Sequence, residues 1–388
     1  MRAVSVGIIG AGFSASLHAE GLKKVFGVEV TISAVAAGSR ERGDEFARHH
    51  GVPTSYVGYH DLLADPAIDV VCVCVPNALH AEVIIAAAMA GKHVICEKPL
   101  TGAFGVGGQD AVHRAREEAA IARESMDAVS AAVDRAGVLF MYAENWIFAP
   151  AMSKTKSLLA HSRADILDIR AEESHSGSHA ARTRDRKTAG GGALLTLGSH
   201  AIGAAIHLKT YEAQIAGRPR PWVSAVSAEI STFSGSSSHE GESWLVDDWV
   251  DVERWANVVL RFNDDTRAAI TASFAMLGGT RNTFEVYTTN SAFRANMTPS
   301  DGLLAFTPDA EAFGDEYLHE KIESRTGWIS ASPDEDWIRG YPQEMQDFMT
   351  CVGEGNQSVS GLDLARDVVD VVYASYVSAE EGRRVELG

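Results

Sequence analysis

A short glycine-containing motif near the start of the chain has the residue types needed to bind the phosphates of a dinucleotide. It follows a β-branched run at Val4 to Ile9 and reads Gly10-Ala11-Gly12-Phe13-Ser14-Ala15. The spacing is G-x-G-x-x-A, in which small residues let the backbone and a helix N-terminus approach a pyrophosphate. A tight strand-to-helix turn without a ligand is the alternative, but the motif's place at the start of a βαβ pattern favours a cofactor.

The end of the next expected strand bears on which dinucleotide would bind. NAD-specific sites usually place an acid there to hold the ribose diol, whereas this strand ends Val35-Ala36-Ala37-Gly38-Ser39-Arg40. Ser39 and Arg40 would suit a 2′-phosphate, through a hydrogen bond and a charge pair, although Arg40 can equally be the solvated first turn of the next helix. The sequence therefore favours NADP over NAD.

A lysine follows the strand expected at His93 to Cys96, within Glu97-Lys98-Pro99. Open α/β sheets bind their ligands at the carboxyl ends of their strands, so Lys98 stands where a reacting group would lie. A solvated surface lysine is the alternative reading. The preceding strand ends in a similar position at Val75-Pro76-Asn77, which His80 follows.

These residues require a parallel sheet to bring them to one edge. Residues 1–143 alternate β-branched runs with helical stretches, and runs such as VVCVCV are apolar on both faces. This pattern is typical of strands that helices cover on each side, and it predicts a doubly wound Rossmann domain over residues 1–145. The expected strands are Val4 to Ile9, Val28 to Ala36, Asp69 to Val75, His93 to Cys96 and Val138 to Tyr142.

Longer alternating patterns begin at Ile166 and predict a second α+β domain over residues 146–388, with a large, mostly antiparallel open sheet. Asn263 to Thr266 reads as a hairpin turn, and residues 293–333 read as loop. The expected strands are Ile166 to Glu173, Val223 to Phe233, Trp249 to Phe262, Thr266 to Ala275 and Thr283 to Thr289. Helices are expected at Pro342 to Cys351, at Leu362 to Glu381 and, as a surface elaboration, at Asp110 to Ala136.

Composition narrows the class of partner. The 388 residues are 46% hydrophobic and 22% charged, with a formal net charge of −18 and a pI near 5.2. An acidic balance disfavours nucleic acid and anionic membrane surfaces and favours a small molecule. The apolar stretches Val70 to Val75 and Val83 to Ala90 are far shorter than the roughly 20 residues that span a bilayer, so we expect no transmembrane helix.

The start of the chain faintly resembles a signal peptide, but glycines interrupt its apolar run, and cleavage after Ala15 would destroy the glycine motif. The four cysteines are too few for a disulfide framework. We therefore expect a cytoplasmic protein with reduced thiols.

Several motifs together resemble the Gfo/Idh/MocA family of nicotinamide-dependent oxidoreductases, the group of glucose-fructose oxidoreductase and inositol dehydrogenase. Besides the glycine motif, VPN with His80, and EKP, they are MYAENWIFAP (141–150), GGGALLTLGSHAIGAAIHLK (190–209) and YPQEMQDFMTC (341–351). The resemblance covers almost the whole chain except residues 101–136. It implies a Rossmann domain, a C-terminal domain whose open sheet forms oligomer contacts, and a cofactor site that includes Pro76, Asn77, His80, Glu97 and Lys98.

The resemblance also implies the reacting groups. Lys98 would polarise and orient the reacting oxygen, and His200 would exchange the hydroxyl proton as hydride moves to or from nicotinamide C4. A helix over 193–208 would place Thr196, His200, Gly203 and His207 on one stripe facing a cleft. The family commonly carries an aspartate where this chain has Thr196, which can bond a substrate hydroxyl but supplies no negative charge.

Other polar residues are candidates for substrate contact. Glu173 and His175 lie at the end of a strand, in the layout of this family near the substrate, and would bind sugar hydroxyls or move a proton. The same two residues with His179 are a weaker candidate for a metal site, and loop histidines are usually only solvated, so no metal is expected. Glu144, Asn145 and Trp146 follow the strand expected at Val138 to Tyr142, where Trp146 would stack on a sugar ring or merely pack.

The leading hypothesis is an NAD(P)-dependent dehydrogenase or reductase acting on a secondary alcohol of a sugar, cyclitol or glycoside. Two alternatives stay open: redox-neutral glycoside cleavage with tightly held cofactor, and a dinucleotide-binding sensor without turnover. The open sheet and the resemblance predict a homodimer or homotetramer that binds neither nucleic acid nor membrane.

Overall fold

A computed structural model describes residues 3–106, 110–178, 180–233, 243–246, 248–322 and 324–388. The chain forms two compact units, each assembled from separate segments. The first unit takes residues 1–103, 120–148 and 340–370, and the second takes 104–119, 149–339 and 371–388. Both units therefore draw on segments from each side of the boundary predicted between residues 145 and 146.

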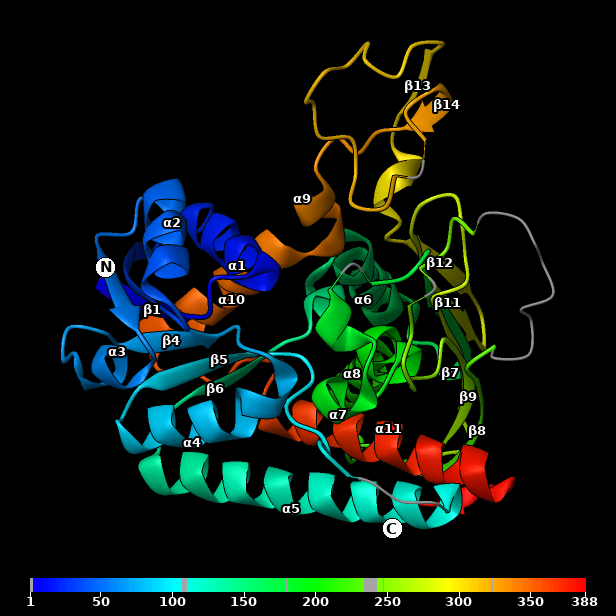
Figure 1. The fold of residues 1–388 in the computed structure, drawn as a ribbon. Helices are drawn as coiled ribbons and strands as arrows, with labels where there is room; N and C mark the ends of the chain where they lie inside the picture. Colours follow the sequence, from blue (N-terminus) through cyan, green and yellow to red (C-terminus); the bar gives the residue numbers. More distant parts are fainter. Residues whose placement is uncertain (1–2, 107–109, 179, 234–242, 247, 323) are drawn as a thin grey trace. The chain divides into compact units, whose positions relative to one another are not determined.

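The first unit contains a parallel sheet in the order β3-β2-β1-β4-β5-β6 (Figure 1). Its central strands are buried on both faces because helices flank the sheet, and this order is that of the dinucleotide-binding Rossmann fold. The predicted strands are confirmed, whereas β3 was missed because its four residues, TSYV, are only half-buried. The strands are β1 (Ala3–Ile9), β2 (Glu29–Ala37), β3 (Thr54–Val57), β4 (Val70–Val73), β5 (His93–Glu97) and β6 (Phe140–Ala143).

Helices α1 to α4 of this unit each follow a strand, whereas α10 comes from far along the chain. The C-terminal α10 packs against α1 so closely that a Cβ at Gly21 would lie 2.8 Å from Cγ of Met345. The predicted helix at Pro342 to Cys351 is thereby confirmed. The helices are α1 (Phe13–Lys23), α2 (Arg40–His50), α3 (His60–Ala64), α4 (His80–Met89) and α10 (Tyr341–Glu354).

The helix expected over residues 110–136 is confirmed as α5 (Ala111–Ala136). It is more than a surface elaboration, because Met126 and Val129 on its inner face are fully buried. Ion pairs also join it to α11 (Leu362–Glu381), beside which it runs in Figure 1. Arg123 lies 3.0 Å from Asp370, and Arg366 lies 2.6 Å from Asp127.

The second unit contains a sheet in the order β12-β11-β7-β10-β9-β8-β15. All its pairs are antiparallel except β7 with β10, which confirms the predicted fold class. The predicted turn at Asn263 to Thr266 joins β9 to β10, although β9 begins six residues later than expected. The strands are β7 (Ile166–Ser174), β8 (Val223–Ser231), β9 (Trp255–Phe262), β10 (Arg267–Ser273), β11 (Arg281–Thr288), β12 (Ala292–Asn296) and β15 (Val385–Glu386).

One face of this sheet is covered by α8 (Ser199–Ile215), on whose other side lies α6 (Pro150–Ser162). Among the described residues, the stretch Arg186–Ile215 is long and apolar enough to cross a membrane, but 94% of its most apolar window is buried. It is the core helix of this unit. The opposite sheet face carries exposed apolar side chains, including Leu167 and Val259.

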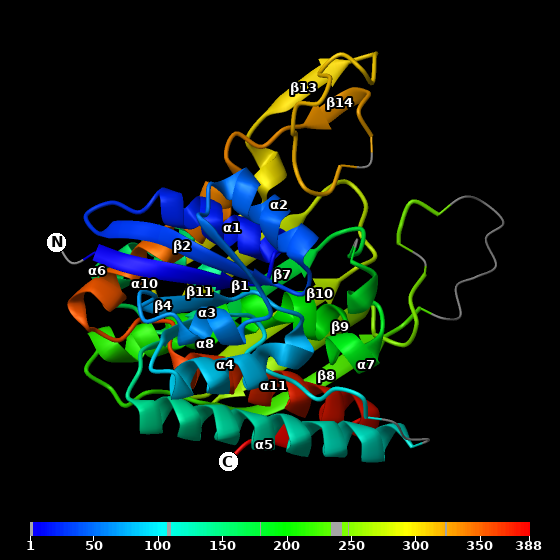
Figure 2. The ribbon, with the colours of Figure 1, turned by 60° about the vertical axis from the view of Figure 1, so that its left-hand side comes forward.

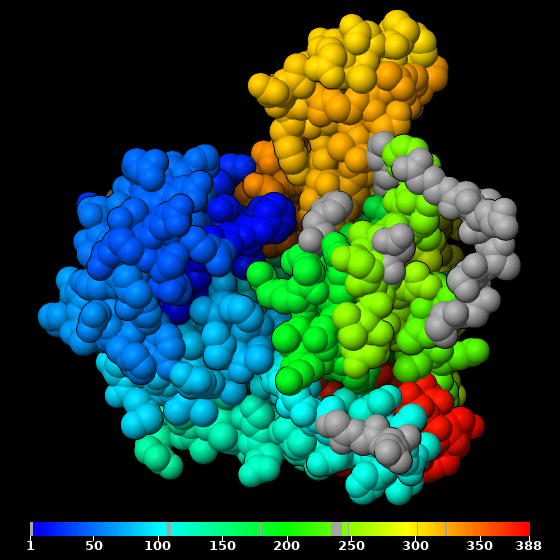
Figure 3. All heavy atoms as spheres, viewed as in Figure 1, coloured from blue at the N-terminus to red at the C-terminus, as the bar shows by residue number. Residues whose placement is uncertain are grey.

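Residues 293–333, expected as loop, contain the end of β12 and a small hairpin that the sequence did not reveal. Its strands are β13 (Leu304–Thr307) and β14 (Gly327–Ser330), whose four-residue lengths are too short for a clear alternation. Figure 2 shows the hairpin projecting from the rest of its unit, and in the space-filling view of Figure 3 this region of the chain forms a yellow and orange projection. The Phe306 and Trp328 rings meet across it at 5.4 Å.

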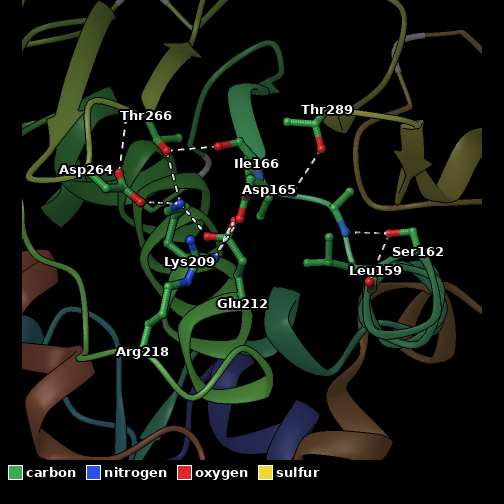
Figure 4. A network of polar contacts seen from close by, with 11 residues as sticks. Leu159, Ser162, Asp165, Ile166, Lys209, Glu212, Arg218, Asp264, Thr266 and Thr289 are labelled. Atoms are coloured by element: carbon green, nitrogen blue, oxygen red, sulfur yellow. Dashed lines mark hydrogen bonds and ion pairs between the residues drawn. The ribbon is translucent and has the colours of Figure 1, made fainter.

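The C-terminal half of α8 is anchored by a buried lysine, Lys209 (Figure 4). Nζ of Lys209 lies 2.7 Å from Asp264 Oδ2 and 3.0 Å from Thr266 Oγ1, and it forms an ion pair with Glu212. Asp264 and Thr266 belong to the turn between β9 and β10, so this network fixes α8 to the end of that hairpin. A buried ammonium requires such partners, because an isolated charge is strongly penalised in a protein interior.

Candidate functional site

The glycine motif forms the turn between β1 and α1. Gly10 has φ of +119°, and a Cβ there would lie 2.2 Å from the carbonyl oxygen of Cys74, so only glycine fits. Gly12 precedes α1, with no side chain capping the helix, and a Cβ there would meet nothing within 4 Å. The first amides of α1 thus face open space, which suits the phosphates of a dinucleotide. Phe13 is exposed, Ser14 is partly exposed and Ala15 is buried under the helix.

Lys98 immediately follows β5, at the same edge of the sheet as Gly10. Its backbone amide donates to Oε2 of Glu97 at 3.1 Å. The other oxygen of Glu97 lies 3.1 Å from Nε2 of His18, a fully buried residue of α1. Burial alone would raise the pKa of Glu97, but the hydrogen bond from His18 and nearby positive charges hold it below its ordinary value. An ionised carboxylate therefore fixes the backbone at Lys98.

His18 was missed by the sequence analysis. Its only signal was a polar ring on an otherwise small and apolar face of α1, where Ala15, Ala19 and Leu22 are also buried. Such a pattern is common for structural histidines. The sequence therefore does not distinguish a histidine that only packs in the core from one that holds Glu97 beside Lys98.

The residues after β4 form a second loop at this edge. Pro76 is exposed and Asn77 is partly exposed, whereas His80 is 1% exposed. Nδ1 of His80 lies 2.6 Å from the carbonyl oxygen of Pro99, and Nε2 lies 3.0 Å from that of Val75. Burial lowers the pKa of His80. In this structure the ring braces the two loops against each other, and a direct cofactor contact of His80 stays a prediction.

Ser39 and Arg40 lie at the start of α2. The Ser39 hydroxyl caps the helix by accepting from the Arg42 amide at 3.4 Å. Arg40 is exposed, and its Nη1 donates to the carbonyl oxygen of Ser55 at 2.8 Å. That bond holds the guanidinium beside the carboxyl ends of β2 and β3 rather than leaving it as a freely solvated first-turn residue. Recognition of a 2′-phosphate stays a prediction.

In the second unit His200 lies near the start of α8. The expected helix is present, but Leu194–Gly198 forms a π-helix before α8 begins, which sequence periodicity does not reveal. The predicted open stripe is wrong: Thr196 is partly exposed, whereas His200, Gly203 and His207 are buried. His207 instead accepts from Nζ of Lys156 at 3.3 Å. Burial and this positive charge lower the pKa of His207 to about 3.

Glu173 and His175 lie at the end of β7 and are 2% and 8% exposed. Nδ1 of His175 accepts from the amide of Gly177 at 3.0 Å, so the neutral ring carries its proton on Nε2. The ring lies 5.2 Å from that of Phe274, which packs against Ala193 and Leu197 at the π-helix. Through this packing the structure brings the end of β7 together with the segment that carries Thr196.

Glu144, Asn145 and Trp146 were expected to face a cleft, but they are 0%, 2% and 0% exposed. Residues 145–148 form a short 3-10 helix that packs on α10, where the Phe148 and Phe348 rings lie 5.6 Å apart. The structure therefore favours the packing alternative for Trp146. Stacking on a sugar ring would require the indole to become exposed.

Among the described residues, no group of histidine, cysteine, aspartate and glutamate side chains gathers as a metal site. His179, the third member of the weaker metal candidate, lies outside the residues that the structure describes. The four cysteines are buried and unpaired.

Comparison with known proteins agrees with this geometry. Residues 4–132 match the oxidoreductase family with an NAD-binding Rossmann fold, Gfo/Idh/MocA, and residues 161–294 match its C-terminal domain. The chain is 27% identical to levoglucosan dehydrogenase from Pseudarthrobacter phenanthrenivorans over 330 residues, 80% of this chain and 78% of that protein. It is 32% identical to trans-1,2-dihydrobenzene-1,2-diol dehydrogenase from Bos taurus over 197 residues, 50% of this chain and 53% of that protein.

A solved structure shares the whole fold. GenD2 from gentamicin A biosynthesis, crystallised with NAD, has a TM-score of 0.79 and 25% identity, and the match covers 100% of this chain and 97% of that one. The glycine motif before α1, the lysine after β5 and the two matched segments all point to the same family. This chain belongs to the Gfo/Idh/MocA family of oxidoreductases.

Proposed function

We propose that this chain is an NAD(P)-dependent dehydrogenase or reductase acting on a secondary alcohol, or the matching ketone, of a sugar, cyclitol or glycoside. The observation that carries the proposal is the edge of the six-stranded sheet. There the uncapped start of α1 lies at the carboxyl end of β1, and Lys98 lies at the carboxyl end of β5, with β4 between these two parallel strands. This is where a doubly wound sheet holds a dinucleotide and the group that reacts with it.

The chain's own residues would supply binding and proton transfer. When bound, the nicotinamide supplies a hydride acceptor or donor at C4. The Lys98 ammonium would donate to the reacting oxygen and stabilise the negative charge that develops on it. In the oxidative direction hydride leaves the carbinol carbon, the hydroxyl proton passes to His200, and a carbonyl group results.

The substrate class rests on the relatives, which are named for dehydrogenation of levoglucosan and of a cyclic diol. Vicinal hydroxyls are shared by both compounds. The polar residues Glu173, His175 and Thr196 are suited to hydrogen-bond such hydroxyls, because they offer both donors and acceptors. NADP is the preferred cofactor of the proposal, supported by Arg40 and by the missing acid after β2. Assembly as a homodimer or homotetramer accords with the exposed apolar sheet face.

Substitution of the two reacting groups tests the proposal. Lys98→Met and His200→Asn should each lower kcat about 100-fold or more on a sugar or cyclitol that the parent oxidises, and His200→Asn should leave NADP affinity nearly unchanged. Arg42→Ala, an exposed change on α2, is the control for general effects of substitution. Consumption of a glycoside without net nicotinamide reduction would contradict net dehydrogenation and favour redox-neutral cleavage. Dinucleotide binding without turnover on any panel member would favour the sensor.

A further inference from the structure

The helical segment that leads to His200 begins with three consecutive amides held by a single remote residue, Glu253. The Gly192 amide lies 2.9 Å from both Oε1 and Oε2 of Glu253, and the Leu194 amide donates to Oε1 at 3.0 Å. The amide between them, that of Ala193, donates to the backbone carbonyl oxygen of Glu253 at 2.9 Å. Glu253 lies two residues before β9 begins and is 2% exposed.

Glu253 therefore caps this helical segment, although it comes from a different part of the chain. The first amides of a helix have no partners within it, and a local serine, threonine or aspartate normally accepts from them. Here the preceding residues are Gly190, Gly191 and Gly192, which offer no side chain. A carboxylate at a helix N-terminus is also favoured by the helix dipole.

The glycines are required by the approach of Glu253 and its neighbour Tyr376. A Cβ at Gly192 would lie 2.0 Å from the Glu253 carbonyl oxygen, and one at Gly191 would lie 2.2 Å from Oη of Tyr376. The sequence analysis noted these glycines but assigned them no partner. The structure explains them as the space through which a buried carboxylate reaches the helix.

The Glu253 carboxylate is itself held in place. Tyr376 donates to Oε1 at 2.8 Å, and Arg186 lies 3.6 Å from Oε2 with its guanidinium 4.6 Å from the centre of the Tyr376 ring. Arg186 is in turn bound bidentately by Glu118, at 2.8 and 2.6 Å. Glu118 comes from α5, most of which lies within residues 4–132, the segment that matches the family's Rossmann-fold domain. Through Glu118 this long helix braces the network.

We propose that Glu253 is a positioning residue that sets the place of Thr196 and His200 by fixing residues 192–194. The inference rests on the proposed function for the role of His200. From Gly192 the fixed backbone continues directly, because the Thr196 amide donates to the Gly192 carbonyl oxygen at 2.9 Å. For this positioning role, the side-chain oxygen of residue 253 must reach the amides of residues 192 and 194. The negative charge of Glu253, which pairs with Arg186, is not required.

Two substitutions of Glu253 separate reach from charge. Glu253→Gln keeps the length and one accepting oxygen but removes the charge, whereas Glu253→Asp keeps the charge but withdraws the carboxylate by one methylene. Lys209→Met is the matched control, because it breaks the buried ion-pair network at the other end of α8, remote from the cap. All three variants remove a buried polar interaction and should lose stability.

In steady-state kinetics of the full-length variants, kcat should depend on whether the side chain at residue 253 still reaches the amides of residues 192 and 194. Glu253→Asp should lower kcat about 100-fold, as expected for misplacement of a proton-transferring group by about 1 Å, with the dinucleotide Kd unchanged. Glu253→Gln and Lys209→Met should retain kcat within a few-fold of the parent. Loss in Glu253→Gln with retention in Glu253→Asp would overturn the proposal, and so would equal losses in Glu253→Asp and Lys209→Met.

A readout that needs no turnover separates this inference from the proposed function. Hydrogen exchange at residues 192–194 should be slow in the parent and in Glu253→Gln, and faster in Glu253→Asp. In spectra of protein labelled at histidine, the His200 ring signal, assigned with His200→Asn, should move in Glu253→Asp only. An unchanged His200 signal in Glu253→Asp would overturn the inference even in an active enzyme, whereas a parent without turnover would contradict the proposed function alone.

Discussion

Nε2 of His18 on α1 and Oε1 of Glu97 at the end of β5 lie 3.1 Å apart. This pair joins the helix that begins at the glycine motif to the strand that ends at Lys98. Because the second oxygen of Glu97 accepts from the Lys98 amide, we expect a change in α1 to alter the position of Lys98. The glycine motif and Lys98 are therefore parts of one hydrogen-bonded assembly within the first unit.

Replacing His18 should uncouple the two elements. In His18→Leu the buried side of the Glu97 carboxylate loses its donor, which should lower the free energy of unfolding by about 1–3 kcal/mol and reduce kcat. Urea denaturation and steady-state kinetics measure the two effects. His50→Leu is the control, because His50 bonds Glu20 of the same helix at 2.9 Å but has no link to Glu97. A kcat that falls equally in both variants would argue against the coupling.

The two glycines of the fingerprint should respond differently to alanine. Gly10→Ala forces a Cβ against the Cys74 carbonyl oxygen at a positive φ, so it should destabilise the protein by several kcal/mol. Gly12→Ala meets nothing within 4 Å and should leave stability within about 0.5 kcal/mol of the parent. If Gly12 leaves room for a pyrophosphate, its alanine variant should nevertheless bind dinucleotide more weakly in calorimetry. Unchanged affinity would place the phosphates elsewhere.

Cofactor choice should depend on Arg40. Loss of a hydrogen bond between charged groups costs about 1.5–3 kcal/mol, so Arg40→Ala should weaken NADP binding about 10- to 100-fold and leave NAD binding nearly unchanged. Fluorescence titration with both cofactors measures the ratio. Arg42→Ala, on the same helix with the same change in charge, should leave the ratio at the parent value. A parallel loss of both cofactors in Arg40→Ala would instead reflect its bond to Ser55.

Stability should fall in acid because of His207. Its pKa is about 3 in the folded protein and about 6.5 when unfolded, so between these values the unfolded chain binds the additional proton. The free energy of unfolding should therefore fall as pH drops through this window, by up to about 1.4 kcal/mol per pH unit. His207→Gln should flatten that slope in urea titrations, and Lys156→Met should narrow the window by removing one cause of the low pKa. An unaltered slope in His207→Gln would contradict the assignment.

Local patterns were sufficient for the sheet edge that holds the candidate cofactor site. Gly10, Gly12 and Lys98 were predicted from strand ends and small-residue spacing, because those signals lie within a few consecutive residues. Such patterns could not predict residues whose role depends on partners distant in sequence. His18 and Glu253 act across 79 and 61 residues of sequence. The predicted open stripe was wrong because His200, Gly203 and His207 of α8 are buried, and burial depends on what packs against the helix rather than on its period.

Burial was the other property that the sequence did not reveal. Trp146 had the chemistry to stack on a sugar, but it is 0% exposed. Whether an aromatic residue after a strand faces a ligand or the core depends on which later segment covers it. Here the 3-10 helix that contains Trp146 packs on α10, whose residues 341–354 lie far along the chain.

The most direct test is hydride transfer from a polyol labelled with deuterium at its carbinol carbon. The purified protein is incubated with NADP or NAD and a panel of sugars and cyclitols, and the reduced nicotinamide is analysed by mass spectrometry. We expect deuterium on the reduced cofactor in proportion to ketone formed, and an initial rate of transfer that is lower by about 100-fold or more in both Lys98→Met and His200→Asn. Substrate conversion that leaves no deuterium on the nicotinamide, or transfer at the parent rate in Lys98→Met, would contradict the proposed oxidoreductase mechanism.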